Sequence, residues 1–227
     1  MGPYLGTPNT EKDSEDGKNS IVRYGACSMQ GWRKTQEDSH IACLDLPDGA
    51  MIFGVFDGHG GEEVSIYVER YFVDELKKLE EFKSKNYEKC LSTLFRHIDE
   101  LLLSPDGQQK LKEINAQSKN KQNDAFMMPN REESIANFTG CTATVCLVTK
   151  DKFYCANAGD SRTVLARKGK PLVALSEDHK PDNPEEKARI EAAGGYVEEN
   201  RVLGSLNLSR SLGDFEYKNK KDLDFKL

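Results

Sequence analysis

The sequence predicts a single domain of the α+β class, in which antiparallel sheets and helices pack in layers. Short apolar segments typical of strands form two clusters, and two longer segments with helical periodicity lie between them. The connections within the second cluster are short and turn-like, which favours antiparallel strand pairing. With 227 residues, the chain is long enough to bury a sizeable core.

The N-terminal part is expected to form a flexible arm followed by three strands. Residues 1–20 are polar and contain Pro3 and Pro8, which is typical of a loose arm. The third strand is almost entirely apolar, as expected for a strand buried on both faces, and it ends in a glycine-rich turn. The predicted strands cover residues 21–28, 40–46 and 50–56.

Two helices and a polar insertion are predicted next. Apolar side chains recur every three or four residues over 62–82 and again over 87–103, so each helix should bury one face. Residues 104–138 are rich in lysine, asparagine, glutamine and aspartate, and their periodicity is lost after Ile114. This composition indicates a polar surface insertion or mobile loop.

The C-terminal half should contain four strands and a third helix. That helix is predicted to begin at Pro184, with Asn183 capping its N-terminus and Glu186 reaching back to the cap. Gly194 should end it, and the chain after it is expected to be extended over 196–202. The predicted strands cover residues 141–148, 152–157, 162–167 and 171–175.

Charge and composition exclude several classes of partner and compartment. The net charge of −6 disfavours nucleic-acid binding, which needs a basic surface. No apolar stretch is long enough to cross a bilayer, so no transmembrane segment is expected. The six cysteines lack zinc-ligand spacing and no secretory signal is recognised, so we expect a reduced, cytoplasmic protein, with the nucleus as the alternative.

The most informative motif is Asp57-Gly58-His59-Gly60-Gly61, which follows the most apolar strand. Such a strand would deliver one carboxylate to its end, and the glycines would let backbone carbonyls approach the same point. Oxygen ligands of this kind suit hard divalent cations. The alternative is a glycine turn with a solvated aspartate.

Two further segments carry candidate ligands. Arg33 offers a planar group suited to phosphate, and Glu37 and Asp38 follow four residues later. In an extended segment these two carboxylates would point to opposite faces, whereas a loop or bulge could direct both to one cation. Asp160 lies in a predicted turn and is either a cation ligand or a turn residue. Taken alone, each segment also fits a surface charge cluster.

Together, these segments make the sequence resemble the metal-dependent protein serine/threonine phosphatases of type 2C, especially gamma-like eukaryotic members. The resemblance covers roughly residues 21–217 apart from 104–138. The matching motifs occur in the order of the family: GWRKTQED at 31–38, VFDGHGG at 55–61, TGCTATV at 139–145, ANAGDSR at 156–162, DHKP at 178–181 and LSRSLGDF at 208–215.

The resemblance implies an α/β/β/α sandwich with a site for two Mn²⁺ or Mg²⁺ ions at one end of the sheets. In that family pattern, Asp57 bridges both cations and Gly58 contributes a carbonyl. Glu37 acts through water with Asp38 beside it, and Asp160 matches the ligand of a weaker third ion.

The resemblance also implies the reaction and its partners. Phosphoprotein substrates would lose phosphate from serine or threonine by attack of a metal-activated water, without a phospho-enzyme. Arg33 matches the arginine that holds the phosphate. His59 matches the proposed proton donor to the departing oxygen.

The sequence departs from the family pattern in one respect. Two further metal aspartates, which the family carries later in its domain, have no counterpart among these residues. We therefore expect residues 21–227 to be the N-terminal portion of such a domain, whose C-terminal portion is missing, and the 227-residue chain alone to be inactive. The alternative is a non-catalytic subunit or scaffold of a larger assembly. A cysteine-dependent phosphatase using Cys155 and Arg162 fits poorly, because six residues separate them where that chemistry uses five.

Overall fold

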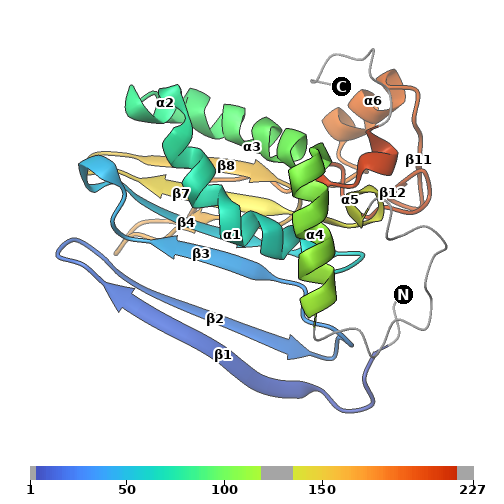
Figure 1. Ribbon diagram of the computed structural model, residues 1–227, viewed down its shortest axis with the longest axis horizontal. Coiled ribbons are helices and arrows are strands. Elements are labelled where there is room, and N and C mark those ends of the chain that lie inside the picture. Colours follow the sequence, from blue (N-terminus) through green and yellow to red (C-terminus); the bar gives the residue numbers. More distant parts are fainter. Residues whose placement is uncertain (1–3, 119–134, 219–227) are drawn as a thin grey trace.

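A computed structural model describes residues 4–118 and 135–218, and at its centre lies a four-stranded antiparallel sheet. The strand order is β3-β4-β7-β8. Helices cover one face of this sheet, and the β1–β2 hairpin lies on the side of the other face (Figure 1). The four strands are β3 (Ser39–Cys43), β4 (Met51–Phe56), β7 (Ala143–Val148) and β8 (Phe153–Ala158). The predicted α+β class with antiparallel sheets is confirmed.

The helical layer contains both predicted long helices. The segment predicted as one helix over 62–82 divides at Leu79, whose ψ of 135° is extended. The helix predicted over 87–103 has those bounds. A short 3-10 helix, Pro47–Gly49, leads into β4. The layer consists of α1 (Glu63–Lys78), α2 (Glu80–Lys83), α3 (Tyr87–Leu103) and α4 (Pro105–Gln117).

The core lies between this helical layer and the sheet. Phe72 of α1 is fully buried, with its ring centroid 5.7 Å from that of Phe56 and 6.0 Å from that of Phe95. Gly54 in β4 leaves room for this packing, because a Cβ there would lie 3.1 Å from Ile41 and 3.2 Å from Phe56. The close packing holds the end of β4 in a fixed position relative to the helices.

The first part of the predicted polar insertion 104–138 is a helix. Ser104 caps α4 by accepting a hydrogen bond from the Gly107 N–H, and Leu111 and Ile114 are buried against the core. Leu111 and Ile114 are the only large apolar side chains that α4 buries, so its sequence shows little periodicity. Residues 119–134 of the predicted insertion lie outside the described residues.

The expectation of a flexible arm over residues 1–20 is wrong for β1, which covers Asn9–Lys18. This strand pairs antiparallel with β2 (Arg23–Gly31), and Asn19 organises the turn by accepting hydrogen bonds from the N–H groups of Ile21 and Val22. Residues on both faces of β1 are exposed, and almost none is buried. Its sequence therefore lacks the alternation of apolar and polar residues by which a strand is predicted. Among the described residues, no helix covers the outer side of this hairpin (Figure 1).

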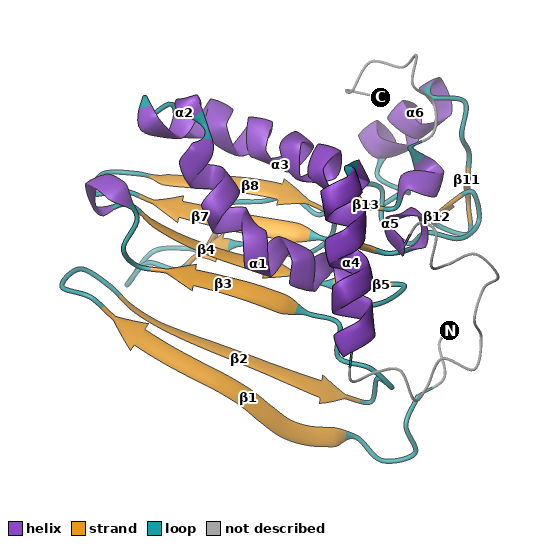
Figure 2. Ribbon diagram, viewed as in Figure 1, coloured by secondary structure: helices purple, strands orange, loops and turns teal. Residues whose placement is uncertain are grey.

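The C-terminal half forms short elements around the end of the sheet. The predicted four-strand meander is confirmed only in pairs, because β7 pairs with β8 and β9 with β10, while β8 and β9 belong to different sheets. A second small sheet has the order β13-β6-β5, so β6 lies between β5 (Gly58–His59) and the C-terminal strand; Figure 2 labels β5 and β13. The other elements are α5 (Ile135–Phe138), β6 (Gly140–Cys141), β9 (Val164–Leu165), β10 (Val173–Ala174), α6 (Pro184–Ala192), β11 (Val197–Glu198), β12 (Arg201–Val202), β13 (Leu212–Gly213) and a 3-10 helix (Phe215–Tyr217).

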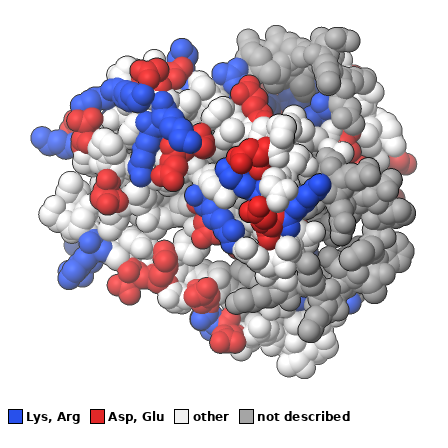
Figure 3. All heavy atoms as spheres, viewed as in Figure 1, with Lys and Arg blue, Asp and Glu red and all other residues white. Residues whose placement is uncertain are grey.

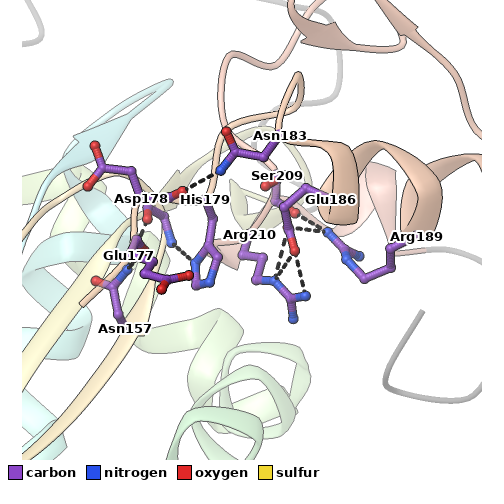
Figure 4. A network of polar contacts seen from close by, with 10 residues as sticks. Asn157, Glu177, Asp178, His179, Asn183, Glu186, Arg189, Ser209 and Arg210 are labelled. Carbon is purple, nitrogen blue, oxygen red and sulfur yellow. Dashed lines mark hydrogen bonds and ion pairs between the residues drawn. The ribbon is translucent and has the colours of Figure 1, made fainter. Parts of the chain in front are cut away.

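A buried carboxylate, Glu186, connects α6 to the segment before β13 (Figure 4). Its oxygens accept hydrogen bonds from Arg210 and Arg189, and Arg189 also donates to the Ser209 carbonyl at 2.7 Å. Burial alone would raise the pKa of Glu186, but the two arginines outweigh it and hold that pKa at about 2. The predicted helix start is confirmed, with Asn183 as the N-cap residue and Pro184 first in the helix, but the predicted capping hydrogen bonds are absent: Glu186 is turned to the arginines, and the Asn183 side chain donates to the Asp178 carbonyl.

The surface charges agree with the composition. Figure 3 shows positive and negative side chains interspersed on the visible face, with no broad basic area among the described residues there. No helix in the described ranges is long and apolar enough to span a membrane. All six cysteines are unpaired.

Candidate metal centre and phosphate site

Asp57 lies at the junction of β4 and β7, where the backbone fixes its position. Its N–H donates to the Thr142 hydroxyl at 3.1 Å, and its carbonyl accepts from the Thr142 N–H at 2.9 Å. The preceding Phe56 is fully buried. Asp57 itself is exposed at the end of the sheet. A strand anchored in the core therefore carries its carboxylate to the surface at a defined point.

The carboxylates predicted as ligands gather around Asp57. Partial burial by the surrounding chain and the negative charges of Asp38 and Asp160 together raise the pKa of Asp57 to about 6. Asp57 remains open to solvent on one side, so this effect comes from neighbouring carboxylates as well as from packing. Segments as far apart in the chain as Asp38 and Asp160 thus lie near enough to Asp57 for their charges to affect it.

Gly58 packs directly against the loop that carries Glu37. A Cβ at Gly58 would lie only 2.4 Å from the Glu37 carbonyl, and the Ser65 hydroxyl at the start of α1 donates to that same carbonyl at 2.6 Å. Residues 32–38 form a loop rather than a strand, which is the arrangement that allows Glu37 and Asp38 to share a site. The Glu37 carboxylate accepts a hydrogen bond from Thr35 at 2.8 Å.

Asp160 is held by a cation of the chain itself. The Lys180 ammonium forms an ion pair with the Asp160 carboxylate, and the neighbouring Arg162 forms a second pair with Asp178 at 2.7 Å. The His179 ring accepts a hydrogen bond from the Gly159 N–H at 3.2 Å, which fixes the turn. A metal ion at Asp160 would therefore have to displace Lys180.

The donor set fits a hard divalent cation. Across residues 4–118 and 135–218, no three His, Cys, Asp or Glu side chains converge in a ready-made metal site. The accumulation of negative charge at Asp57 is nevertheless what a cation would neutralise, and every candidate donor there is oxygen. Mn²⁺ and Mg²⁺ match these donors better than metals that prefer sulfur or imidazole ligands.

Arg33 lies on the exposed side of the same loop. Gln30 holds the loop backbone by donating to the carbonyls of Arg33 and Lys34 at 2.8 and 2.9 Å. Among the described residues, the Arg33 side chain takes part in none of the ion pairs, so its guanidinium is available to a phosphate.

His59 is brought to the site by β5 but is already hydrogen-bonded. Its Nε2 lies 2.7 Å from Oδ2 of Asp214, which is 2% exposed. Its Nδ1 is buried and has no partner in the described part of the chain. Asp214 lies in the LSRSLGDF motif, to which sequence reasoning assigned no mechanism; the nearby Lys180 and Glu186 were likewise missed, because their partners are distant in sequence.

The other reactive side chains have structural surroundings. Burial raises the pKa of Cys155, which keeps its thiol protonated and contradicts the cysteine-dependent alternative. His40 lies 3.0 Å from Glu15, and His97 contacts carboxylates on α1 and α3. The His40 and His97 contacts are with carboxylates at the protein surface, and His179 holds the turn at Gly159.

Comparison with known proteins agrees with the fold and shows the family. A family model described as protein phosphatase 2C matches residues 22–225. Probable protein phosphatase 2C 5 of Paramecium tetraurelia is 48% identical over 226 residues, which cover 100% of this chain and 70% of the relative. Probable protein phosphatase 2C 21 of Arabidopsis thaliana is 40% identical over 243 residues, covering 98% and 68% of the two chains. The chain belongs to the protein phosphatase 2C family, a family of protein phosphatase hydrolases that generally use divalent metal ions.

Two solved structures share the fold at low identity. A phosphatase from a pathogenic strain of Toxoplasma gondii has a TM-score of 0.55 and 22% identity, covering 97% of this chain and 69% of its own. A sex determining protein of C. elegans has a TM-score of 0.56 and 22% identity, covering 92% and 45%. These likenesses confirm the fold class.

Proposed function

We propose that this chain carries the site of a Mn²⁺- or Mg²⁺-dependent protein phosphatase that acts on phosphoserine and phosphothreonine. The observation that carries the proposal is the carboxylate cluster at the end of β4, where Asp38 and Asp160 raise the pKa of Asp57. A fold gains no stability from gathering like charges, so the cluster is best explained by a cation that neutralises it. The six unpaired cysteines agree with a reducing compartment, and we propose a cytoplasmic location with the nucleus as the alternative.

Five residues would hold the cations. Asp57 and the Gly58 carbonyl would bind them directly, with Asp38 beside them. Glu37 would act through water, and Asp160 would bind a further ion once Lys180 is displaced. When bound, the cations supply the positive charge that makes a water molecule nucleophilic near neutral pH.

The remaining residues would handle the substrate. Arg33 would bind the phosphate oxygens through its planar guanidinium and orient phosphorus for in-line attack. His59 would hold at Nδ1 the proton that the departing serine or threonine oxygen receives. Phosphoprotein substrates would bind at the exposed loop that carries Arg33.

Two measurements on the purified chain test the proposal. Mn²⁺ binding by calorimetry is the primary one, because turnover by this chain alone is expected to be weak or absent. Release of phosphate from a phosphothreonine peptide, with and without chelator, is the second. Binding with chelator-sensitive release supports the proposal. Binding without release supports the metal site and agrees both with an N-terminal portion that is inactive alone and with the non-catalytic alternative, whereas the absence of Mn²⁺ binding contradicts the metal site.

Arg33→Ala is expected to weaken binding of the phosphothreonine peptide about tenfold to a hundredfold. Hydrogen bonds between charged groups contribute roughly 1.5–3 kcal/mol, and this change removes them from the phosphate rather than from the reaction step. The measurement is KM, or the peptide's dissociation constant, in the presence of Mn²⁺. Lys34→Ala is the matched control, because it removes the neighbouring exposed cation. An equal loss of peptide affinity in Arg33→Ala and Lys34→Ala would show that the peptide responds to the positive charge of the loop in general and not to Arg33 in particular.

A further inference from the structure

The small sheet β13-β6-β5 joins the glycine-rich motif to the C-terminal segment. Gly58 and Gly213 lie on the outer strands, with β6 between them. In this register, Gly140 pairs with His59 on one side and with Gly213 on the other. Asp214 follows Gly213 directly, so the topology places its side chain across Gly140 from His59.

Gly140 lies between the His59 and Asp214 side chains, and because it has no side chain of its own, the two can contact each other. A Cβ at Gly140 would lie 2.4 Å from Oδ2 and 2.6 Å from Cγ of Asp214. Any side chain at this position would therefore occupy the space of the carboxylate that contacts His59. Gly213 is similarly required, because its φ is 80° and a Cβ there would lie 2.5 Å from the Thr139 carbonyl.

Asp214 is held in place by several independent contacts. Its backbone has a φ of 54°, in the left-handed region that is rare for a residue with a side chain. Its N–H donates to the Thr139 carbonyl at 3.2 Å, and its carboxylate accepts from the Ser211 hydroxyl at 2.5 Å. Asp99 of α3 fixes the strand before it by accepting from the Gly213 N–H at 2.9 Å. A buried carboxylate with this backbone is positioned for a specific partner.

We infer that Asp214 is the positioning residue of His59, fixing the rotation of its imidazole ring and keeping a proton on Nε2. With Nε2–H donated to the carboxylate, a doubly protonated ring would give its Nδ1 proton to the leaving oxygen and become the neutral Nε2–H form. Nδ1 is buried in this structure, so substrate binding would have to uncover it. The inference rests on the proposed function of His59. It adds a residue 155 positions away in the sequence that holds the ring in its tautomer.

Nuclear magnetic resonance of histidine labelled with ¹⁵N tests this inference directly. The chain has four histidines, and His59→Gln identifies the signals of His59. In the unaltered chain, His59 should show a hydrogen-bonded, slowly exchanging Nε2 proton. Asp214→Asn should abolish this signal or shift the ring towards the other tautomer. An unchanged His59 spectrum in Asp214→Asn overturns the inference.

A second variant separates positioning from loss of charge. Gly140→Ala keeps the Asp214 carboxylate but displaces it, so it should change the His59 spectrum in the same way. Asp178→Asn is the matched control: it removes a carboxylate from an ion pair with Arg162 that does not touch His59. A His59 spectrum altered equally by Asp178→Asn would show a general structural effect and overturn the inference. If Gly140→Ala does not fold, the isosteric Asp214→Asn still decides the question.

Turnover distinguishes this inference from the proposed function. Asp214→Asn should lower kcat for a phosphothreonine peptide roughly tenfold or more, with KM unchanged, because its leaving oxygen needs a proton. Hydrolysis of p-nitrophenyl phosphate, whose leaving group needs none, should change less than about twofold. Equal losses on both substrates overturn the positioning role. If the unaltered chain hydrolyses neither substrate, as expected for this portion of the domain alone, Mn²⁺ binding decides the proposed metal site and the spectrum of His59 decides the role of Asp214.

Discussion

Asp57→Asn is expected to stabilise the metal-free chain and to abolish its response to Mn²⁺. The pKa of Asp57 is about 6 in the folded chain and 3.8 ordinarily, so folding disfavours its ionised form. Stability should therefore fall as pH rises from about 4 to about 6, and the ionised carboxylate remains unfavourable at pH 7. Asparagine removes that charge while keeping the shape of the side chain.

Thermal unfolding with and without Mn²⁺ measures both effects. Solvent at this exposed position limits the gain to about 1 kcal/mol, which corresponds to a rise of roughly 2–4 °C in Tm for a domain of this size. In the unaltered chain, Mn²⁺ should raise Tm by binding only the folded state, whereas in Asp57→Asn it should not. Any phosphatase turnover should be lost with it.

Asp151→Asn is the control for Asp57→Asn, because Asp151 lies in the exposed turn between β7 and β8. It should leave both Tm and the Mn²⁺ response unchanged. Activity like that of the unaltered chain at low Mn²⁺ in Asp57→Asn would refute the assignment of Asp57 to both cations. A lower Tm in the metal-free variant would contradict the charge repulsion.

Glu186→Gln should be the most destabilising of these substitutions. Arg189 and Arg210 both donate to this buried carboxylate, and glutamine leaves two cations without their counter-charge. Breaking one partner of a buried ion pair costs about 3–5 kcal/mol. The depression of the Glu186 pKa from 4.5 to about 2 gives a similar figure, roughly 3 kcal/mol at about 1.4 kcal/mol per pKa unit.

The pH dependence gives this prediction a second test. Because the folded-state pKa of Glu186 is depressed, its stabilisation is present above about pH 4.5 and is lost as pH falls towards about 2. Urea unfolding should show a difference of roughly 3 kcal/mol between the unaltered chain and Glu186→Gln at pH 7, shrinking towards pH 2.

Glu191→Gln on the same helix serves as the control for Glu186→Gln. Its side chain is exposed, and its contact with Lys187 is 3.9 Å long, so it should cost less than about 1 kcal/mol. A difference between Glu186→Gln and the unaltered chain that does not vary between pH 7 and pH 2 would mean that the loss comes from packing rather than from charge.

Local patterns in the sequence determined the sheet and the main helices. The apolar run that became β4, the helical periodicity over 87–103 and the glycines after Asp57 are all short-range signals, and each predicted its element closely. The candidate ligands were found in the same way, because Arg33, Glu37 and Asp38 lie within a few residues of each other. A candidate ligand at the end of a strand can be predicted from the residues next to it in the sequence.

Elements without an apolar pattern were decided only by the tertiary structure. β1 is held by backbone pairing with β2 while its side chains remain exposed, so nothing in its composition distinguishes it from an arm. The helix α4 depends mainly on Leu111 and Ile114 for its contact with the core. Hydrogen bonding and a few contacts across the fold outweighed local composition in both cases.

The partners of the site residues were also decided by the tertiary structure. Asp214 reaches His59 across 155 positions because three strands align with Gly140 between them, and Lys180 pairs with Asp160 through the turn fixed by His179. The sequence alone predicted which residues are candidates for the chemistry. Only folding determined which charges face one another, because electrostatic and hydrogen-bonding partners depend on distance in space rather than along the chain.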